Sequence, residues 1–196
     1  MANPQKAKGD RFEREAVQVL LTLGAESELP LRSNPMRMLG AGRAEDVGDL
    51  HVFPHVAIQV KAWAASRLGV ALVTASGDAA VQATNAGLPL GLGMVVIPRT
   101  QTGGAVRWMA AAQTWPVDPP GDLPEFKLVS RMVPWLRDDA GPKGYRAWGR
   151  LERVAVFNPG GSPHSVFVAP IEAWLAAYAT WLDAAVSDME APKIPA

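Results

Sequence analysis

The segment VGDLHVFPHVAIQVKAW, residues 47 to 63, predicts two neighbouring strands and carries polar side chains where apolar ones are expected. The strands should cover 48–53 and 56–62, on either side of a Pro-His pair. Side chains alternate between the two faces of a strand, so the apolar residues of the second strand share one face and its polar residues share the other. The residues that interrupt the apolar pattern are Asp49, Gln59 and Lys61.

The apolar alternation also predicts how the two strands pair. A register shift of one residue would move the apolar side chains of one strand to the solvent face, so the apolar sets of both strands should face the same side. We therefore expect an odd-length connection or a bulge, and a register that collects the three polar residues on one face. The pairs in this register are Leu50 with Val60, Asp49 with Lys61, and His51 with Gln59.

An amphipathic helix is predicted over 10–23, with Asp10 as its N-cap. Glu13 lies beside the apolar stripe of this helix. A carboxylate at the edge of a buried face is costly unless a cation compensates it. A divalent metal ion, Lys61 or a nearby arginine would each supply that charge.

A carboxylate, an amide oxygen and an ammonium group at strand spacing suit metal-dependent phosphodiester cleavage. Mg²⁺ prefers oxygen ligands, neutralises the phosphate and lowers the pKa of the attacking water. A lysine can hold that water or stabilise the charge of the transition state. The alternative is a solvated edge hairpin in which Asp49 and Lys61 form a surface ion pair. Asp46 is a rival acid, and His51 is a further candidate ligand.

Four short segments resemble the PD-(D/E)xK nuclease superfamily, and most closely the archaeal-type Holliday-junction resolvases. They are KGDRFERE (8–15), LRS (31–33), GDL (48–50) and QVK (59–61). The resemblance covers about residues 8–98 and implies a restriction-endonuclease-like fold with the element order α-β-β-β-α-β. The implied catalytic residues are Glu13, Asp49, Gln59 and Lys61, and the implied ligands of Mg²⁺ or Mn²⁺ are Glu13, Asp49 and Gln59.

Position 59 departs from the family pattern. The family has Glu two residues before the lysine of its third motif, whereas this chain has Gln59. An amide oxygen can coordinate Mg²⁺ but carries no charge, so the metal site would be weaker and would depend more on Asp49 and Glu13. Some branches of the superfamily have Gln there and remain nucleases. The other interpretation is a site that binds DNA without cutting it.

The resemblance implies DNA as the partner, with branched or four-way junction DNA as the substrate. A Gly- and Pro-rich loop at 25–46 leads into the site, and its arginines are placed to contact phosphates. A junction needs two symmetric cuts, so we expect a homodimer, with the acidic segment 151–190 away from DNA. The helix predicted at 170–188 could form the dimer contact or pack on its own core. The expected DNA contacts are Lys8, Arg32, Arg37 and Arg43.

The rest of the chain predicts an alternation of helices and strands. Helices are expected at 74–86, 126–138 and 170–188, and strands at 90–98, 105–112, 152–157 and 165–169. A Pro-rich segment at 115–125 marks a boundary. We therefore predict an α/β protein with two parts. These are a restriction-endonuclease-like core over 8–112, with a mixed central sheet flanked by helices, and a C-terminal α/β extension over 113–196.

Composition narrows the class of protein but does not identify a partner. Lys+Arg and Asp+Glu both number 19. The absence of cysteine excludes disulfides and thiolate metal sites and permits a cytoplasmic location. We expect no membrane association, because no apolar run is long enough to span a bilayer. The predicted function is a Mg²⁺-dependent DNA endonuclease. The alternatives are a non-cutting DNA-binding or scaffold protein on the same fold, and a sequence- or damage-specific nuclease.

Overall fold

The computed structural model describes residues 4–37, 48–97, 107–119, 121–136, 153–160 and 165–190. The helices are α1 (Pro4–Glu26), α2 (Leu68–Asn85), α3 (Val129–Leu136) and α4 (Ile171–Glu190), with a short 3-10 helix η1 (Ala65–Arg67). The strands are β1 (Met36–Arg37), β2 (Leu50–His51), β3 (Val56–Lys61), β4 (Leu90–Ile97), β5 (Arg107–Ala112), β6 (Glu125–Phe126), β7 (Ala155–Phe157) and β8 (Val166–Pro170).

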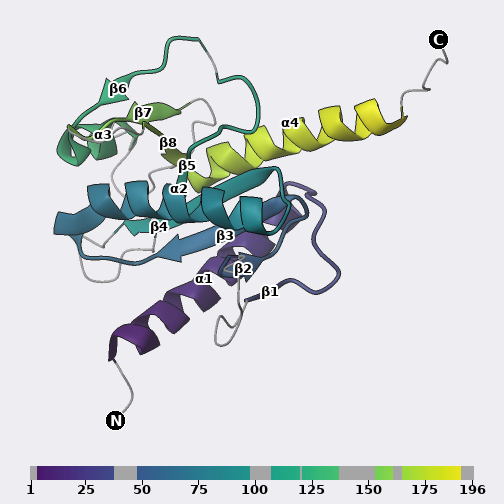
Figure 1. The fold of residues 1–196 in the computed structure, drawn as a ribbon, viewed down its shortest axis with the longest axis horizontal. Helices are drawn as coiled ribbons and strands as arrows, with labels where there is room; N and C mark the ends of the chain where they lie inside the picture. The colour runs from purple at the N-terminus through teal and green to yellow at the C-terminus, as the bar shows by residue number, and fades with distance from the viewer. Residues whose placement is uncertain are drawn as a thin grey trace.

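The strands form one open, mixed sheet in the order β1-β2-β3-β4-β5-β8-β7-β6. Strands β3 and β4 are parallel and are joined by the crossover helix α2, whereas β2 and β3 are antiparallel. The helices cover both faces of the sheet (Figure 1). This arrangement confirms the α/β class. With the short helix η1 left aside, the chain begins with the order α1-β1-β2-β3-α2-β4.

Two apolar cores lie on opposite faces of the sheet. The first contains Ile58 of β3 together with buried residues of α1 and α4, such as Leu20 and Trp174. The second contains Val95 of β4 together with buried residues of α2 and α3, such as Leu72. Within the described residues, the structure has no helix whose length and apolar character would let it span a membrane.

The predicted register of β2 against β3 is wrong by two residues. Leu50 lies opposite Ile58, not opposite Val60. The chain turns earlier than expected, because Phe53 leaves the strand and is completely buried, and His55 adopts a positive φ of 64°. A shift by an even number keeps every side chain on its predicted face. The shift therefore changes the neighbours within the polar face but not its membership.

Two helices begin earlier than predicted. Helix α1 begins at Pro4, so Asp10 lies inside it and is not the N-cap. Proline is favoured at the first helical position because its fixed φ suits the helix and its missing N–H needs no partner there. Helix α2 begins at Leu68 and includes Gly69, where a Cβ atom would lie 3.1 Å from a methyl carbon of Val129. The absence of a side chain at position 69 therefore lets the start of α2 pack closely against α3.

The second half of the chain continues the same sheet. Strand β8 pairs antiparallel with β5, so one sheet spans both sides of the predicted boundary after residue 112. The apolar stripe of α4 packs on its own core, since Trp174 and Tyr178 are completely buried. The Tyr178 hydroxyl donates a hydrogen bond of 2.6 Å to the carbonyl oxygen of Pro54. Figure 1 shows the C-terminal part of α4 extending beyond the sheet.

Glycines let α2 approach the sheet closely. A Cβ atom on Gly93 would lie 2.8 Å from the Cβ of Ala75, and one on Gly91 would lie 2.6 Å from the carbonyl oxygen of Ala79. Gly93 is the residue of β4 that lies beside Gln59 of β3. The absence of side chains at these two positions therefore brings α2 within reach of the polar face of β3.

Candidate active site

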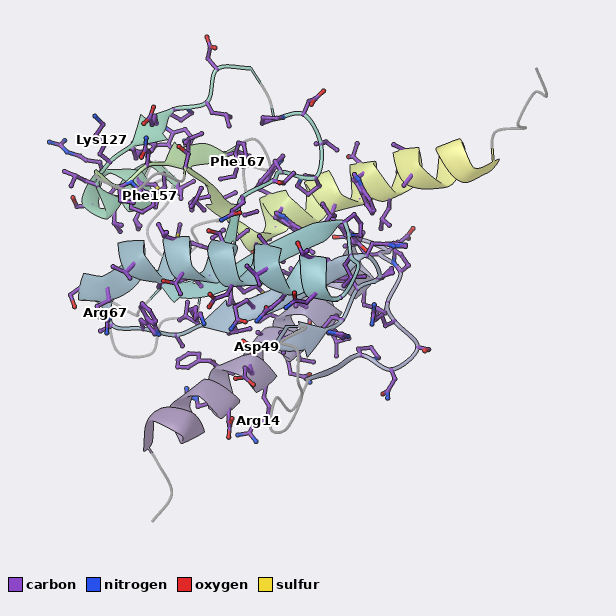
Figure 2. All side chains as sticks on the ribbon, viewed as in Figure 1. Arg14, Asp49, Arg67, Lys127, Phe157 and Phe167 are labelled. Atoms are coloured by element: carbon purple, nitrogen blue, oxygen red, sulfur yellow. The ribbon has the colours of Figure 1, made fainter. Side chains whose placement is uncertain are left out.

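The centre of the candidate site is a contact between Asp49 and Gln59. The Gln59 side-chain Nε2 donates a hydrogen bond of 2.5 Å to Asp49 Oδ2, and the backbone N–H of Val60 donates to the same oxygen at 2.9 Å. The backbone N–H of Asp49 donates to the carbonyl oxygen of Ile58, which holds the start of β2 against β3. Figure 2 labels Asp49 beside the central strands of the sheet. The sequence prediction that Asp49 and Gln59 share one face is confirmed.

Helix α2 extends this contact into a buried line of polar groups. Gln82 Nε2 donates a hydrogen bond to Gln59 Oε1. Both glutamines are buried, with 6% and 2% of their surface exposed. A buried amide without a hydrogen-bond partner costs about 1–3 kcal/mol. The contacts with Asp49 and Gln82 avoid that cost for Gln59. Asp49, Gln59 and Gln82 therefore form one connected network.

Lys61 lies two residues further along β3, on the same face as Gln59. Its Nζ lies 2.8 Å from Asp78 Oδ2 of α2. The Lys61 side chain is 19% exposed and that of Asp78 is 43% exposed, so this pair borders solvent. The predicted pairs of Asp49 with Lys61 and of His51 with Gln59 are wrong. In the observed register Gln59 contacts Asp49, and Lys61 forms an ion pair with Asp78.

His51 contacts Arg32 and not Gln59. Arg32 Nη1 lies 3.0 Å from His51 Nδ1, and the backbone N–H of Arg32 donates to the carbonyl oxygen of Val52. A guanidinium group can only donate, so His51 Nδ1 is the acceptor of this hydrogen bond. Arg32 is thereby held against β2, with part of its side chain at the surface.

Glu13 lies on a helix that covers the other face of the sheet. The buried residues of α1, Ala16 and Leu20, pack in the same core as Ile58. Gln59 and Lys61 alternate with Ile58 along β3 and point towards α2. Glu13 is half-buried at the side of α1, and its place among the metal ligands stays a prediction.

The other predicted DNA contacts are only partly described. Arg37 belongs to β1, where it pairs with Leu50, and Lys8 belongs to α1. The side chains of Lys8 and Arg37 lie outside what the structure describes, as do Arg43 and the rival acid Asp46. Their roles stay predictions.

Sequence reasoning missed Asp78 and Gln82. Both lie in α2, four residues apart, and four residues make about one helical turn. Asp78 is the one charged residue in the sequence of α2. A single acid one turn before a glutamine, in a helix otherwise made of small and apolar residues, was the signal that could have identified this polar face.

A further exposed feature lies just beyond Lys61. The Arg67 guanidinium carbon lies 4.6 Å from the centre of the Trp63 ring, a geometry typical of a cation–π contact. Arg67 is exposed at the N-terminal end of α2, and Trp63 is half-buried (Figure 2). A basic group and an aromatic ring thus lie together after the end of β3, at the start of α2.

The donor chemistry of the site suits a hard cation. Asp49 offers carboxylate oxygen and Gln59 offers an amide oxygen, both of which Mg²⁺ and Mn²⁺ accept. Gln59 Oε1 accepts from Gln82, so it would face an ion at Asp49 only after the amide turned. No three carboxylate or imidazole side chains of the described segments lie close enough to hold a metal ion together. An ion bound here would therefore need amide or water oxygens as well as Asp49.

Comparison with protein-family models, with curated proteins and with solved structures finds no match for this chain. The candidate site is therefore interpreted from its own geometry and chemistry.

Proposed function

We propose that this protein is a metal-dependent DNA endonuclease that hydrolyses phosphodiester bonds in branched DNA, such as a four-way junction. The observation that carries the proposal is the contact between Asp49 and Gln59, with Lys61 next on the same face of β3. The element order α1-β1-β2-β3-α2-β4 around these residues supports it. That order, together with Asp49 and Lys61, resembles the pattern of the PD-(D/E)xK nucleases, from which Gln59 departs.

Each residue has a distinct role in this proposal. Asp49 would supply the negative charge that holds Mg²⁺ or Mn²⁺, and Gln59 would supply a further oxygen ligand. The bound ion would neutralise the scissile phosphate and lower the pKa of the attacking water. The Lys61 ammonium group stabilises the charge that develops on the phosphate oxygens. Phosphate contacts from Arg32, Arg37 and Arg43 would hold the DNA in place.

The preference for branched DNA and the homodimer rest on the resemblance. Two chains related by a two-fold axis would present two sites for paired cuts in a junction. The apolar stripe of α4 is buried in its own core, so the contact between the two chains would use another surface. Sedimentation of the protein at micromolar concentration, with and without junction DNA, tests this part of the proposal.

Cleavage of matched DNA substrates tests the proposed activity. Labelled four-way junction, linear duplex of the same sequence and supercoiled plasmid are incubated with Mg²⁺, with Mn²⁺ and with chelator. We expect metal-dependent cuts, faster in the junction than in the duplex. Asp49→Asn should abolish cleavage and leave DNA binding intact, and Lys61→Ala should lower turnover with metal affinity little changed. Val81→Ala, at an exposed position of α2, is the matched control and should cleave like the wild type. Cleavage by Asp49→Asn at the wild-type rate would refute the metal assignment.

A second candidate function is DNA binding without cleavage. The observation that favours it is the closed set of contacts, in which the neutral Gln59 is buried between Asp49 and Gln82 and Lys61 pairs with Asp78. In this case the protein would bind junction DNA and leave it intact with either metal ion. The same experiment therefore separates the two functions.

A further inference from the structure

Helix α2 and strand β3 contact each other through two polar pairs in matched register. Asp78 pairs with Lys61, and Gln82 pairs with Gln59. Two residues of a strand span about 6.6 Å and four residues of a helix span about 6 Å. The helix runs back along the strand, so both pairs form at the same time. The contact between Asp78 and Lys61 is therefore one of two side-chain pairs with matching spacing along α2 and β3.

The position of Asp78 is unusual for its helix. It is the one acid in a helix of small and apolar residues, and it lies in the helix interior, where aspartate is a poor helix former. Its side chain is 43% exposed. A surface ion pair of this kind adds little to the stability of a fold, so stability does not explain why an acid lies opposite Lys61.

Positioning of Lys61 does explain it. A lysine ammonium group is a point charge on a flexible four-carbon stem with three rotatable donors. A single contact with Asp78 fixes the Nζ and leaves the other donors for a phosphate oxygen. Catalytic charges contribute most when they are held in place before the reaction.

We infer that Asp78 is a positioning residue that holds the Lys61 ammonium group ready for the scissile phosphate, and this inference rests on the proposed nuclease function. Asp78 acts through Lys61 and does not itself contact the substrate. The opposite role would be a latch, in which Asp78 keeps Lys61 away from DNA and its removal accelerates the reaction.

A double-mutant cycle tests the inference. Asp78→Ala, Asp78→Asn, Lys61→Ala and the double variant Asp78→Ala/Lys61→Ala are compared with the wild type in junction cleavage, under single-turnover and multiple-turnover conditions. Val81→Ala is the control on the same helix. Circular dichroism shows that each variant is folded, and Asp78→Asn keeps an oxygen acceptor of the same size.

We expect Asp78→Ala to lower kcat about tenfold, with KM and DNA affinity unchanged. Asp78→Asn should lose less, because it keeps a hydrogen-bond acceptor for Lys61. The double variant should be no slower than Lys61→Ala alone, because the effect of Asp78 passes through that lysine.

Three outcomes would overturn the inference. These are wild-type kcat in Asp78→Ala, a faster rate in that variant, and losses that multiply in the double variant. A wild-type protein that cuts no DNA would remove the proposed function and this inference together. A wild-type protein that cuts, with an unaffected Asp78→Ala, would remove the inference alone.

Discussion

Asp49, the residue before β2, contacts Gln59 of β3, and the Gln59 amide nitrogen lies 2.5 Å from Asp49 Oδ2. A neutral side chain at position 59 can donate to the carboxylate of Asp49, which a carboxylate at that position could not do. The chain therefore has a stable arrangement at this site without a metal ion. The identity of residue 59 sets how strongly the site depends on metal.

Gln59→Glu should make folding stability depend on divalent metal. In chelator, two carboxylates would face each other in a buried place, and their repulsion should lower the melting temperature. Mg²⁺ or Mn²⁺ would relieve that repulsion, and a ligand that binds only the folded state raises its stability. Thermal unfolding with chelator and with millimolar metal measures both effects. A melting temperature equal to that of the wild type in chelator would contradict the closeness of residues 49 and 59.

Gln82→Leu should destabilise the fold more than its double variant with Gln59→Leu. The single change leaves the buried Gln59 carbonyl without its donor, which costs about 1–3 kcal/mol. The double change removes the amide that needs a partner, although Asp49 then loses the donor that Gln59 supplies. Urea unfolding of the wild type, both single variants and the double variant gives the coupling energy. Additive losses would show that the two glutamines do not contact each other.

The shared face of Asp49, Gln59 and Lys61 could be predicted from the sequence, but the partners of these residues, and the place of Glu13 on the opposite side of the sheet, could not. The alternation of Val56, Ile58 and Val60 identified the polar face of β3, because a strand has a period of two. The register differed by two residues, since burial of Phe53 shortened β2, and the apolar pattern does not change when the register shifts by two. Contacts between side chains depend on that shift.

The contacts between helix α2 and strand β3 also could not be predicted from the sequence. Asp78 and Gln82 contact Lys61 and Gln59 because Gly91 and Gly93 let α2 approach the sheet. The approach depends on packing between distant segments, which no local pattern encodes. The pairing of β8 with β5 could not be predicted for the same reason. It adds strands from the second half of the chain to the sheet formed by the first half.

Arg67→Ala should weaken DNA binding in a salt-dependent way. Arg67 lies on Trp63 just beyond Lys61, and each lost phosphate contact should reduce the slope of log affinity against log salt by about 1. Stability should change by less than about 0.5 kcal/mol, because Arg67 is exposed. Lys127→Ala is the control for lost positive charge, since Figure 2 shows Lys127 on the β6 side of the molecule, away from Asp49. Equal slopes for Arg67→Ala and the wild type would exclude Arg67 from the DNA interface.

Tyr178 should make the fold sensitive to alkaline pH. Tyr178 is completely buried, and its ring stacks on Trp174 with 5.3 Å between the ring centres. Its hydroxyl donates a hydrogen bond to the carbonyl oxygen of Pro54. Burial raises the pKa of Tyr178 above its usual value, and the nearby charge of Arg32 lowers it by a smaller amount. In the unfolded chain a tyrosine ionises at about pH 10. The stabilisation should therefore be complete below that pH and be lost as pH rises through and above it.

The expected loss is about 1.4 kcal/mol for each pH unit above about pH 10, as long as Tyr178 stays neutral in the folded state. Tyr178→Phe should cost about 1 kcal/mol at neutral pH, where the hydrogen bond to Pro54 is lost. The same variant should remove this contribution to the alkaline slope, because phenylalanine does not ionise. Urea unfolding between pH 8 and pH 11 measures both quantities. An alkaline slope that is the same in Tyr178→Phe and the wild type would show that other groups cause the loss of stability.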